Sequence, residues 1–220
     1  MNDSAYLALY FDAPLQSWGY ASKFDRRTTL AHPTRSGVIG LLCAAMGMDR
    51  SDTQGLAKLE EALKVDVYAF RLGQRLTDYH TVGGGYDPKR EPLRICRKAS
   101  GSIGSTVQTW REYLEEARFG VVVSGPADMV ERLADAVRDP VWGIWLGRKS
   151  CVPAARVFEG VHDDKDAALA ALRKAFGDND AVVTRKIVEP RSFADGNDTL
   201  MDRPLDFSTR RFASRRIQVE

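Results

Sequence analysis

The residues at 32–42, HPTRSGVIGLL, combine a cation, hydroxyl groups and two glycines at the start of a predicted helix. Ser36 is a good N-cap residue, and the apolar spacing after it is helical. Gly37 and Gly40 would each cost an ordinary helix about 1 kcal/mol relative to alanine, which indicates that another backbone comes close. Arg35, beside free N–H groups and the positive end of the helix dipole, favours a phosphate site. A close helix–sheet contact with a solvated arginine explains the same pattern, so both interpretations stay open.

A second candidate for phosphate binding is the run Gly147, Arg148, Lys149 and Ser150, which follows the apolar stretch VWGIWL. Glycine allows a close backbone approach, the two cations supply charge, and the hydroxyl group donates a hydrogen bond. The run therefore predicts a compact phosphate grip. The alternative is a solvated charged loop.

Two further side chains suit the recognition of a nucleobase. Gln16 and Trp18 come directly after a predicted strand, where an amide can read a base edge and an indole can stack on a base. A tryptophan packed over the edge of the sheet is the alternative interpretation.

His80, within DYHT, is the one plausible catalytic group in the sequence. With Tyr79 beside it and Lys89 or Lys98 nearby, it could support metal-free cleavage of RNA by general acid–base chemistry at a 2′-OH. Alternatively, Asp78 orients the His80 ring for structure or for stacking on RNA, and we give this interpretation more weight. No spacing of His and Cys residues predicts a metal site, and no motif predicts a cofactor.

The composition is that of an ordinary globular protein. The chain has 220 residues, a formal net charge of +2 and three widely spaced cysteines, which do not form a disulfide pattern. The first residues lack the features of a signal peptide, and no apolar run could cross a membrane, so a cytoplasmic protein is expected. Basic residues nevertheless cluster at 89–98, 148–149, 185–186 and 210–216. Such local clusters suit contact with a polyanion.

The order of predicted elements indicates an α+β fold of ferredoxin type, which is also the RRM-like fold, with helices on one sheet face and a binding surface on the other. Residues 77–108 are too rich in glycine, proline and basic residues for an ordinary connection, and a protruding β-hairpin is expected there, with one arm at 93–97. Residues 196–203 are rich in turn-forming residues. The predicted strands are 6–11, 65–72, 120–123, 181–188 and one within 207–219, and the predicted helices are 36–48, 53–63, 127–137 and 166–176.

Several motifs occur in an order that is specific to one family. They lie at 14–19, 32–42, 78–81, 108–113, 146–151 and 211–215. In these motifs the chain resembles the Cas-five family of the RAMP superfamily, in the branch that supplies a subunit of the type I-E CRISPR surveillance complex, Cascade. The resemblance extends over essentially the whole length.

This resemblance implies a single RAMP-type domain over residues 1–220. The palm would comprise 1–80 and 108–220, including a smaller C-terminal β-containing part, and the thumb would be an insertion at about 81–107. Members of the family bind the 5′ handle of the CRISPR RNA and cap the filament of CasC backbone subunits. They also touch the large subunit CasA, and they reach target DNA through the assembled complex. The implied role is therefore RNA binding in antiviral defence, without membrane contact.

The resemblance also implies roles for individual side chains. The residues expected to hold handle phosphates are Arg35, Ser36, Gly147, Arg148, Lys149 and Ser150. The residues expected to stack on bases or to wedge between them are Trp18, Tyr79, His80 and Trp110. Gln16 and Gln108 are expected to read base edges, and Arg111 to support the thumb or contact the RNA backbone.

Two alternatives to this role stay open. In type I-E systems a separate endonuclease, CasE, processes the precursor RNA, so a non-catalytic subunit is favoured. Related type I-C subunits cut the precursor themselves, and a metal-free endoribonuclease that uses His80 is therefore the first alternative. A structural protein whose basic patches bind only protein partners is the second.

Overall fold

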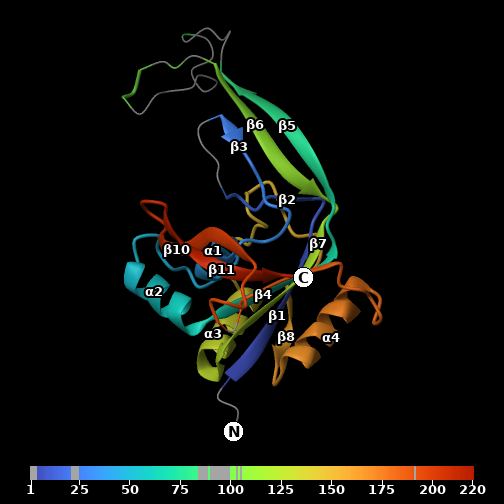
Figure 1. The fold of residues 1–220 in the computed structure, drawn as a ribbon. Helices are drawn as coiled ribbons and strands as arrows, with labels where there is room; N and C mark the ends of the chain where they lie inside the picture. Colours follow the sequence, from blue (N-terminus) through green and yellow to red (C-terminus); the bar gives the residue numbers. More distant parts are fainter. Residues whose placement is uncertain are drawn as a thin grey trace.

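The structure is a computed structural model that describes residues 4–20, 25–83, 89, 100–102, 104, 106–190 and 192–220. In this part of the chain, a large antiparallel sheet carries helices on both faces, and a long β-ribbon rises from one end of it (Figure 1). None of the helices in the described ranges has the length and apolar character needed to span a membrane.

The centre of the large sheet has the ferredoxin-like arrangement. The chain runs through β1, two helices, β4, then β7, a helix and β8, and these strands lie side by side in the order β4-β7-β1-β8. That is the split βαβ pattern, and the predicted α+β fold class is confirmed. The elements are β1 (Ser4–Asp12), α1 (Arg35–Ala45), α2 (Thr53–Ala62), β4 (Lys64–Arg71), β7 (Arg118–Pro126), α3 (Ala127–Arg138) and β8 (Phe158–His162).

One face of this sheet is covered by α1, α2 and α3. The side chains of Leu7, Leu9 and Phe11 in β1 are fully buried on this face, together with Ile39 of α1 and Leu133 of α3. Because side chains alternate along a strand, the intervening residues of β1 point to the other face.

The other face is not free. Helix α4 (Lys165–Phe176) lies on it, with Leu172 in a second apolar cluster that includes Tyr10 and Phe70. A Cβ at Gly120 would stand 2.8 Å from Leu172 Cδ1, so this glycine lets the helix approach the sheet. The expectation that this face is an open binding surface is wrong where α4 covers it, because the strands beneath are apolar on both sides.

The C-terminal part extends the sheet beyond β4. It comprises β9 (Arg185–Val188), β10 (Asp198–Asp206) and β11 (Arg211–Val219), and β9 pairs with both β4 and β11. Residues 198–203, within a predicted turn-rich stretch, are in fact part of β10. Its inward positions include Leu200 and a buried aspartate, Asp202, so the period-two pattern of burial was hidden by a polar residue.

The ribbon consists of β5 (Gln74–Val82) and β6 (Val107–Glu115), which pair along their whole lengths. The other edge of β6 carries the short strands β2 (Leu15–Gln16) and β3 (Arg26–Arg27). The ribbon therefore starts well before residue 81, the expected beginning of the thumb. The predicted hairpin arm at 93–97 and most of the basic cluster at 89–98, including Lys98, lie outside the described residues.

Candidate nucleic-acid interface

The β5–β6 ribbon has two faces of different chemistry. In an antiparallel pair, directly opposed residues point to the same side. Tyr79 is opposite Trp110 and Thr81 is opposite Gln108, whereas Asp78 is opposite Arg111 and His80 is opposite Thr109. We call the side with Tyr79 and Trp110 the aromatic face, and the side with His80 and Arg111 the basic face.

The aromatic face exposes two ring systems close together. The ring centroids of Tyr79 and Trp110 are 5.4 Å apart, with the rings tilted by 47°. The guanidinium of Arg26, which β3 places beside Trp110, lies 5.5 Å from the Trp110 centroid. The Tyr79 side chain is 52% exposed although nothing in the fold requires an aromatic residue there. Exposed rings beside a cation form a platform on which unpaired bases can stack.

Polar groups flank this platform. Gln108 is exposed next to Thr81, farther along the ribbon from its base. At the base of the ribbon, Arg75 donates hydrogen bonds to Glu112 Oε2 over 2.7 Å and to the Thr29 carbonyl over 2.8 Å. These bonds tie the ribbon to the chain that enters β3, and they hold the platform in place.

The basic face carries His80 and two arginines. His80 Nδ1 is 3.1 Å from Asp78 Oδ2, and both side chains are nearly half exposed. Arg111 donates from Nε to Thr109 Oγ1 over 3.1 Å, and β3 sets Arg27 beside it. Neither arginine side chain makes an ion pair with a residue that the structure describes. These guanidinium groups are therefore available to phosphates.

The segment 146–151, the expected phosphate grip, mainly holds the ribbon to the palm. Arg148 donates to the Glu112 carbonyl over 3.0 Å and to the Arg27 carbonyl over 2.8 Å, and its guanidinium lies 4.7 Å from the Tyr113 ring centroid. Because its donors face main-chain carbonyls, Arg148 is a structural tie, and the structure corrects the expected phosphate contact.

The neighbours of Arg148 differ in their surroundings. Gly147 has φ +99°, and a Cβ there would stand 1.7 Å from the Ser17 carbonyl oxygen, so the close approach is to this chain's own backbone. The hydroxyl of Ser150 is 3.5 Å from that of Tyr113. Lys149 is exposed and has no described partner, so it keeps its expected availability to a phosphate.

Three expected RNA contacts lie inside the protein instead. Trp18 is only 1% exposed and stacks on Phe11, with centroids 5.5 Å apart. Gln16 is fully buried, where it donates to the Phe11 and Ala117 carbonyls and accepts from Trp18 Nε1 over 3.2 Å. The expected stacking by Trp18 and base reading by Gln16 are thus corrected, because no ring face or amide edge is open to RNA.

Arg35 is the third of these buried residues. Its Nε donates to Glu60 Oε1 over 2.8 Å, its terminal nitrogens donate to the Glu60 and Leu63 carbonyls, and it forms an ion pair with Glu189. Burial raises the pKa of Glu60 even though Arg35 lies against it. With its donors already occupied, Arg35 cannot hold an RNA phosphate, and this expected role is corrected too.

The start of α1 does bind an anion, but the anion belongs to the protein. The Arg35 main-chain N–H donates to Asp202 Oδ2 over 2.7 Å, and Thr34 caps the helix by accepting from the Gly37 N–H. A Cβ at Gly37 would stand 2.9 Å from the Trp18 ring, so the close approach that this glycine permits is to a side chain. Ser36 is half-buried, and its hydroxyl donates to Thr34 Oγ1 over 3.3 Å.

Ser36, Gly147 and Lys149 come together at one groove of about 990 Å³. Its walls are α1, the segment 141–149 and the β10–β11 turn. The two sequence motifs that suggested phosphate binding thus meet at one place, at the foot of the ribbon.

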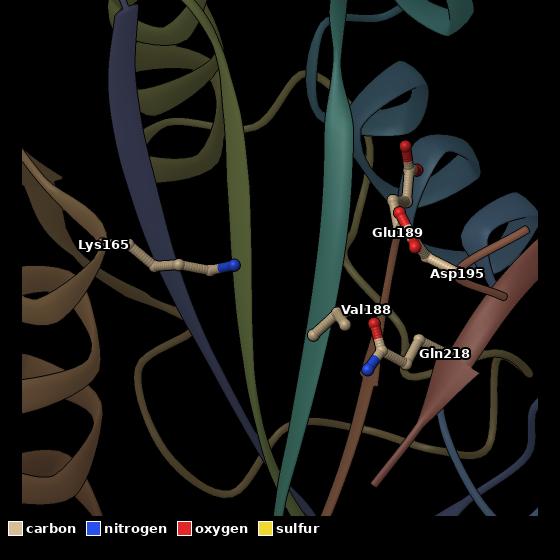
Figure 2. A pocket seen from close by; sticks show the side chains of 5 residues that line it. All are labelled: Lys165, Val188, Glu189, Asp195 and Gln218. Carbon is tan, nitrogen blue, oxygen red and sulfur yellow. The ribbon is translucent and has the colours of Figure 1, made fainter. Parts of the chain in front are cut away.

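A second hollow, of about 450 Å³, lies near the end of β9 (Figure 2). Its charged groups already have partners: Lys165 forms an ion pair with Asp66, Glu189 with Arg35, and Asp195 accepts hydrogen bonds from Ser192. With two carboxylates in its lining, this hollow does not suit a polyanion.

Sequence reasoning left two residues out of the site. Arg26 and Arg27 were recognised only as a pair at a loop tip, and their place beside β6 depends on a parallel pairing that no local pattern shows. Two adjacent arginines in a polar loop were the available signal. Within the described ranges, no three His, Cys, Asp or Glu side chains gather where they could hold a metal ion.

Comparison with known proteins places this architecture among CRISPR proteins. Residues 6–219 match the family model described as CRISPR-associated protein (Cas_Cas5). The chain is 37% identical over 179 residues to the CRISPR system Cascade subunit CasD of Escherichia coli (strain K12), which covers 76% of each chain. A chain of a solved CRISPR RNA-guided surveillance complex matches with a TM-score of 0.77 at 31% identity, covering 98% of this chain and 89% of that one. A crystal structure of a Cas protein matches with a TM-score of 0.67 at 28% identity, covering 98% and 93%.

Proposed function

The chain belongs to the Cas5 family of CRISPR-associated proteins, and we propose that it is a non-catalytic, RNA-binding subunit of a type I-E Cascade surveillance complex. The observation that carries this proposal is the exposed pair Tyr79 and Trp110 beside Arg26 on a projecting ribbon. The family membership and the names of its relatives, a Cascade subunit and an RNA-guided complex, supply the biological setting.

The ligand is the 5′ handle of the CRISPR RNA. Handle bases are unpaired, so they can stack on Tyr79 and Trp110, and Gln108 can read a base edge beside them. A repeat-derived handle has a constant sequence, for which such base contacts are useful. The guide segment varies and has to be held by its backbone alone.

The phosphates are held from the basic face. Arg27 and Arg111 supply guanidinium groups, His80 supplies a ring that Asp78 orients, and Lys149 supplies an ammonium group at the foot of the ribbon. These groups come from β3, β5, β6 and the segment 146–151, so only the folded chain presents them together.

The place of the chain in the complex follows from the family. We propose that it caps the CasC backbone filament, touches the large subunit CasA, and contributes to recognition of target DNA through the assembled complex. What supports this is the likeness to the surveillance-complex chain over 98% of the present sequence.

An endoribonuclease is the second candidate, and one observation favours it. Because Asp78 faces His80 Nδ1 at 3.1 Å, His80 Nε2 remains open to accept a proton, and Arg111 lies across from Asp78. Against this candidate, cleavage at a 2′-OH also needs an acid for the leaving oxygen. In the described part of the chain, the neighbours on this face supply only Thr109 and Arg111.

The two candidates are separated by incubating the purified protein with labelled repeat-containing RNA in EDTA and measuring binding and cleavage together. We expect binding without cleavage. We also expect Trp110→Ala to weaken binding by about 1–3 kcal/mol, the value of one stacked base. Trp142→Ala, which removes an exposed indole away from the ribbon, is the matched control. Cleavage that His80→Ala abolishes would make the protein a processing nuclease.

A further inference from the structure

An apolar patch is exposed where the chain leaves α3. Val141 is 66% exposed and Trp142 46% exposed. The backbone that carries them is fixed, because Val141 N–H and Trp142 N–H donate to the Ala45 and Ala44 carbonyls at the end of α1. Large apolar side chains held rigidly in solvent contribute little to folding, and they mark a surface that another molecule covers.

These side chains form one wall of the groove beside α1, and the floor of the groove is also apolar. Gly40 of α1 contributes no side chain, and a Cβ there would meet only the Phe207 ring at 3.6 Å. The polar atoms nearby are already bonded: Ser17 Oγ donates to the Glu112 carbonyl, and Thr34 Oγ1 accepts from the Gly37 N–H. A nucleobase needs polar partners along its edge, so this floor suits an apolar protein side chain better than a base.

The charge at the rim points to the second property of the occupant. The two acidic residues there are engaged locally, because Asp49 accepts from Ser51 and Asp52 caps α2 by accepting from the Gly55 N–H. The two arginines there, Arg50 and Arg210, have no partner among the residues that the structure describes. The unneutralised charge of the rim is thus positive, and it complements an acidic partner.

We propose that this groove binds a segment of a neighbouring protein subunit that presents an apolar anchor flanked by acidic side chains. The anchor lies between Trp142 and Gly40, and the acidic groups face Arg50 and Arg210. This inference rests on the proposed function, since a subunit of an assembly has neighbours. It adds a protein-docking surface that is separate from the RNA-binding faces of the ribbon.

The test uses the complex assembled from this chain, the CRISPR RNA and the partner subunits expressed together. We expect Trp142→Ala, and Arg50→Glu with Arg210→Glu, each to lower incorporation at least tenfold. RNA binding by the isolated variant protein Trp142→Ala should stay unchanged. Val182→Ala, which truncates an exposed apolar residue outside the groove, is the control and should assemble normally.

A photocrosslinking residue at position 142 identifies the occupant. Crosslinks to a protein peptide with acidic residues around an apolar one support the proposal. Crosslinks to RNA, loss of RNA binding by Trp142→Ala, or crosslinks no more frequent than at position 182 overturn it. Failure of the unaltered chain to bind RNA and assemble would instead contradict the proposed function.

Discussion

Arg35 joins four segments of the chain through a single side chain and its own backbone. It contacts Glu60 and Leu63 at the end of α2, Glu189 after β9, and Asp202 in β10. A buried cation of this kind is expensive to leave unpaired, and so are the carboxylates around it. At the scale of the residue, Arg35 therefore affects stability and has no part in the RNA-binding surface.

Replacing Arg35 with alanine should destabilise the fold strongly, because it leaves the buried Glu60 without its partner. We expect a loss of about 3–5 kcal/mol in the free energy of unfolding, as for broken buried pairs. Urea denaturation measures it, and Arg50→Ala, an exposed arginine, should change stability by less than about 0.5 kcal/mol. Normal stability with weakened RNA binding would restore a phosphate contact for Arg35.

Arg27 and Arg111 should each contribute one phosphate contact. Loss of one contact lowers affinity for all RNA sequences alike and reduces the slope of log affinity against log salt by about 1. The measurement is a titration of labelled handle RNA at several salt concentrations with Arg27→Ala and Arg111→Ala. Arg132→Ala, on the far side in α3, serves as the control. An unchanged slope in both ribbon variants would remove these arginines from the interface.

At the scale of the element, the segment 146–151 connects the ribbon to the palm. Ser17 N–H donates to the Leu146 carbonyl over 3.0 Å, and Arg148 donates to carbonyls of β3 and β6. The ribbon would otherwise be joined to the sheet mainly by its own two strands. Its base is therefore held from a third side, which fixes the direction in which its two faces point.

The glycine in this segment offers a clean test of that connection. Gly147→Ala puts a methyl group 1.7 Å from the Ser17 carbonyl oxygen at a φ of +99°. Gly177→Ala has a similar φ, +94°, with nothing within 4 Å of the new Cβ. We expect the Gly177 variant to lose about 1 kcal/mol through backbone strain alone. The Gly147 variant should have a clearly lower Tm, and equal Tm values would contradict the close approach.

At the scale of the whole molecule, the junction between the ferredoxin-like core and the C-terminal strands contains a buried histidine. His32 lies before α1, its Nδ1–H donates to the Pro33 carbonyl over 3.0 Å, and Asp202 and Arg215 are nearby. Burial lowers the pKa of His32 below its ordinary value of 6.5. The folded protein thus favours the neutral ring, whereas the unfolded chain binds a proton more readily.

This difference predicts a loss of stability in mild acid. The contribution of His32 is complete above pH 6.5 and falls as the pH drops through 6.5 toward the lower pKa of the folded state. Unfolding in urea between pH 7.5 and pH 5 should therefore show a steeper decline for the unaltered protein than for His32→Asn, which cannot be protonated. Parallel curves for the two proteins would show that His32 does not couple folding to pH.

The sequence by itself determined the α+β class, the order of strands and helices in the core, and the motifs that identify the family. These follow from the local periodicity of apolar residues and from residue types at short spacing, such as the spacing that buries Leu133 in α3. The same local rules indicated that residues 77–108 were unusual, although they did not show that 77–82 and 107–108 continue as paired strands.

Only the tertiary structure decided which polar and aromatic side chains face solvent. The partners that bury Gln16 and Arg35 are distant in sequence: Ala117 is 101 residues from Gln16, and Asp202 is 167 residues from Arg35. A tryptophan or an arginine can satisfy its chemistry inside a fold as well as on RNA. Trp18 lies against Phe11 and Gly37, whereas Trp110 lies on a ribbon with no packed layer over it, because strand register and packing place them there.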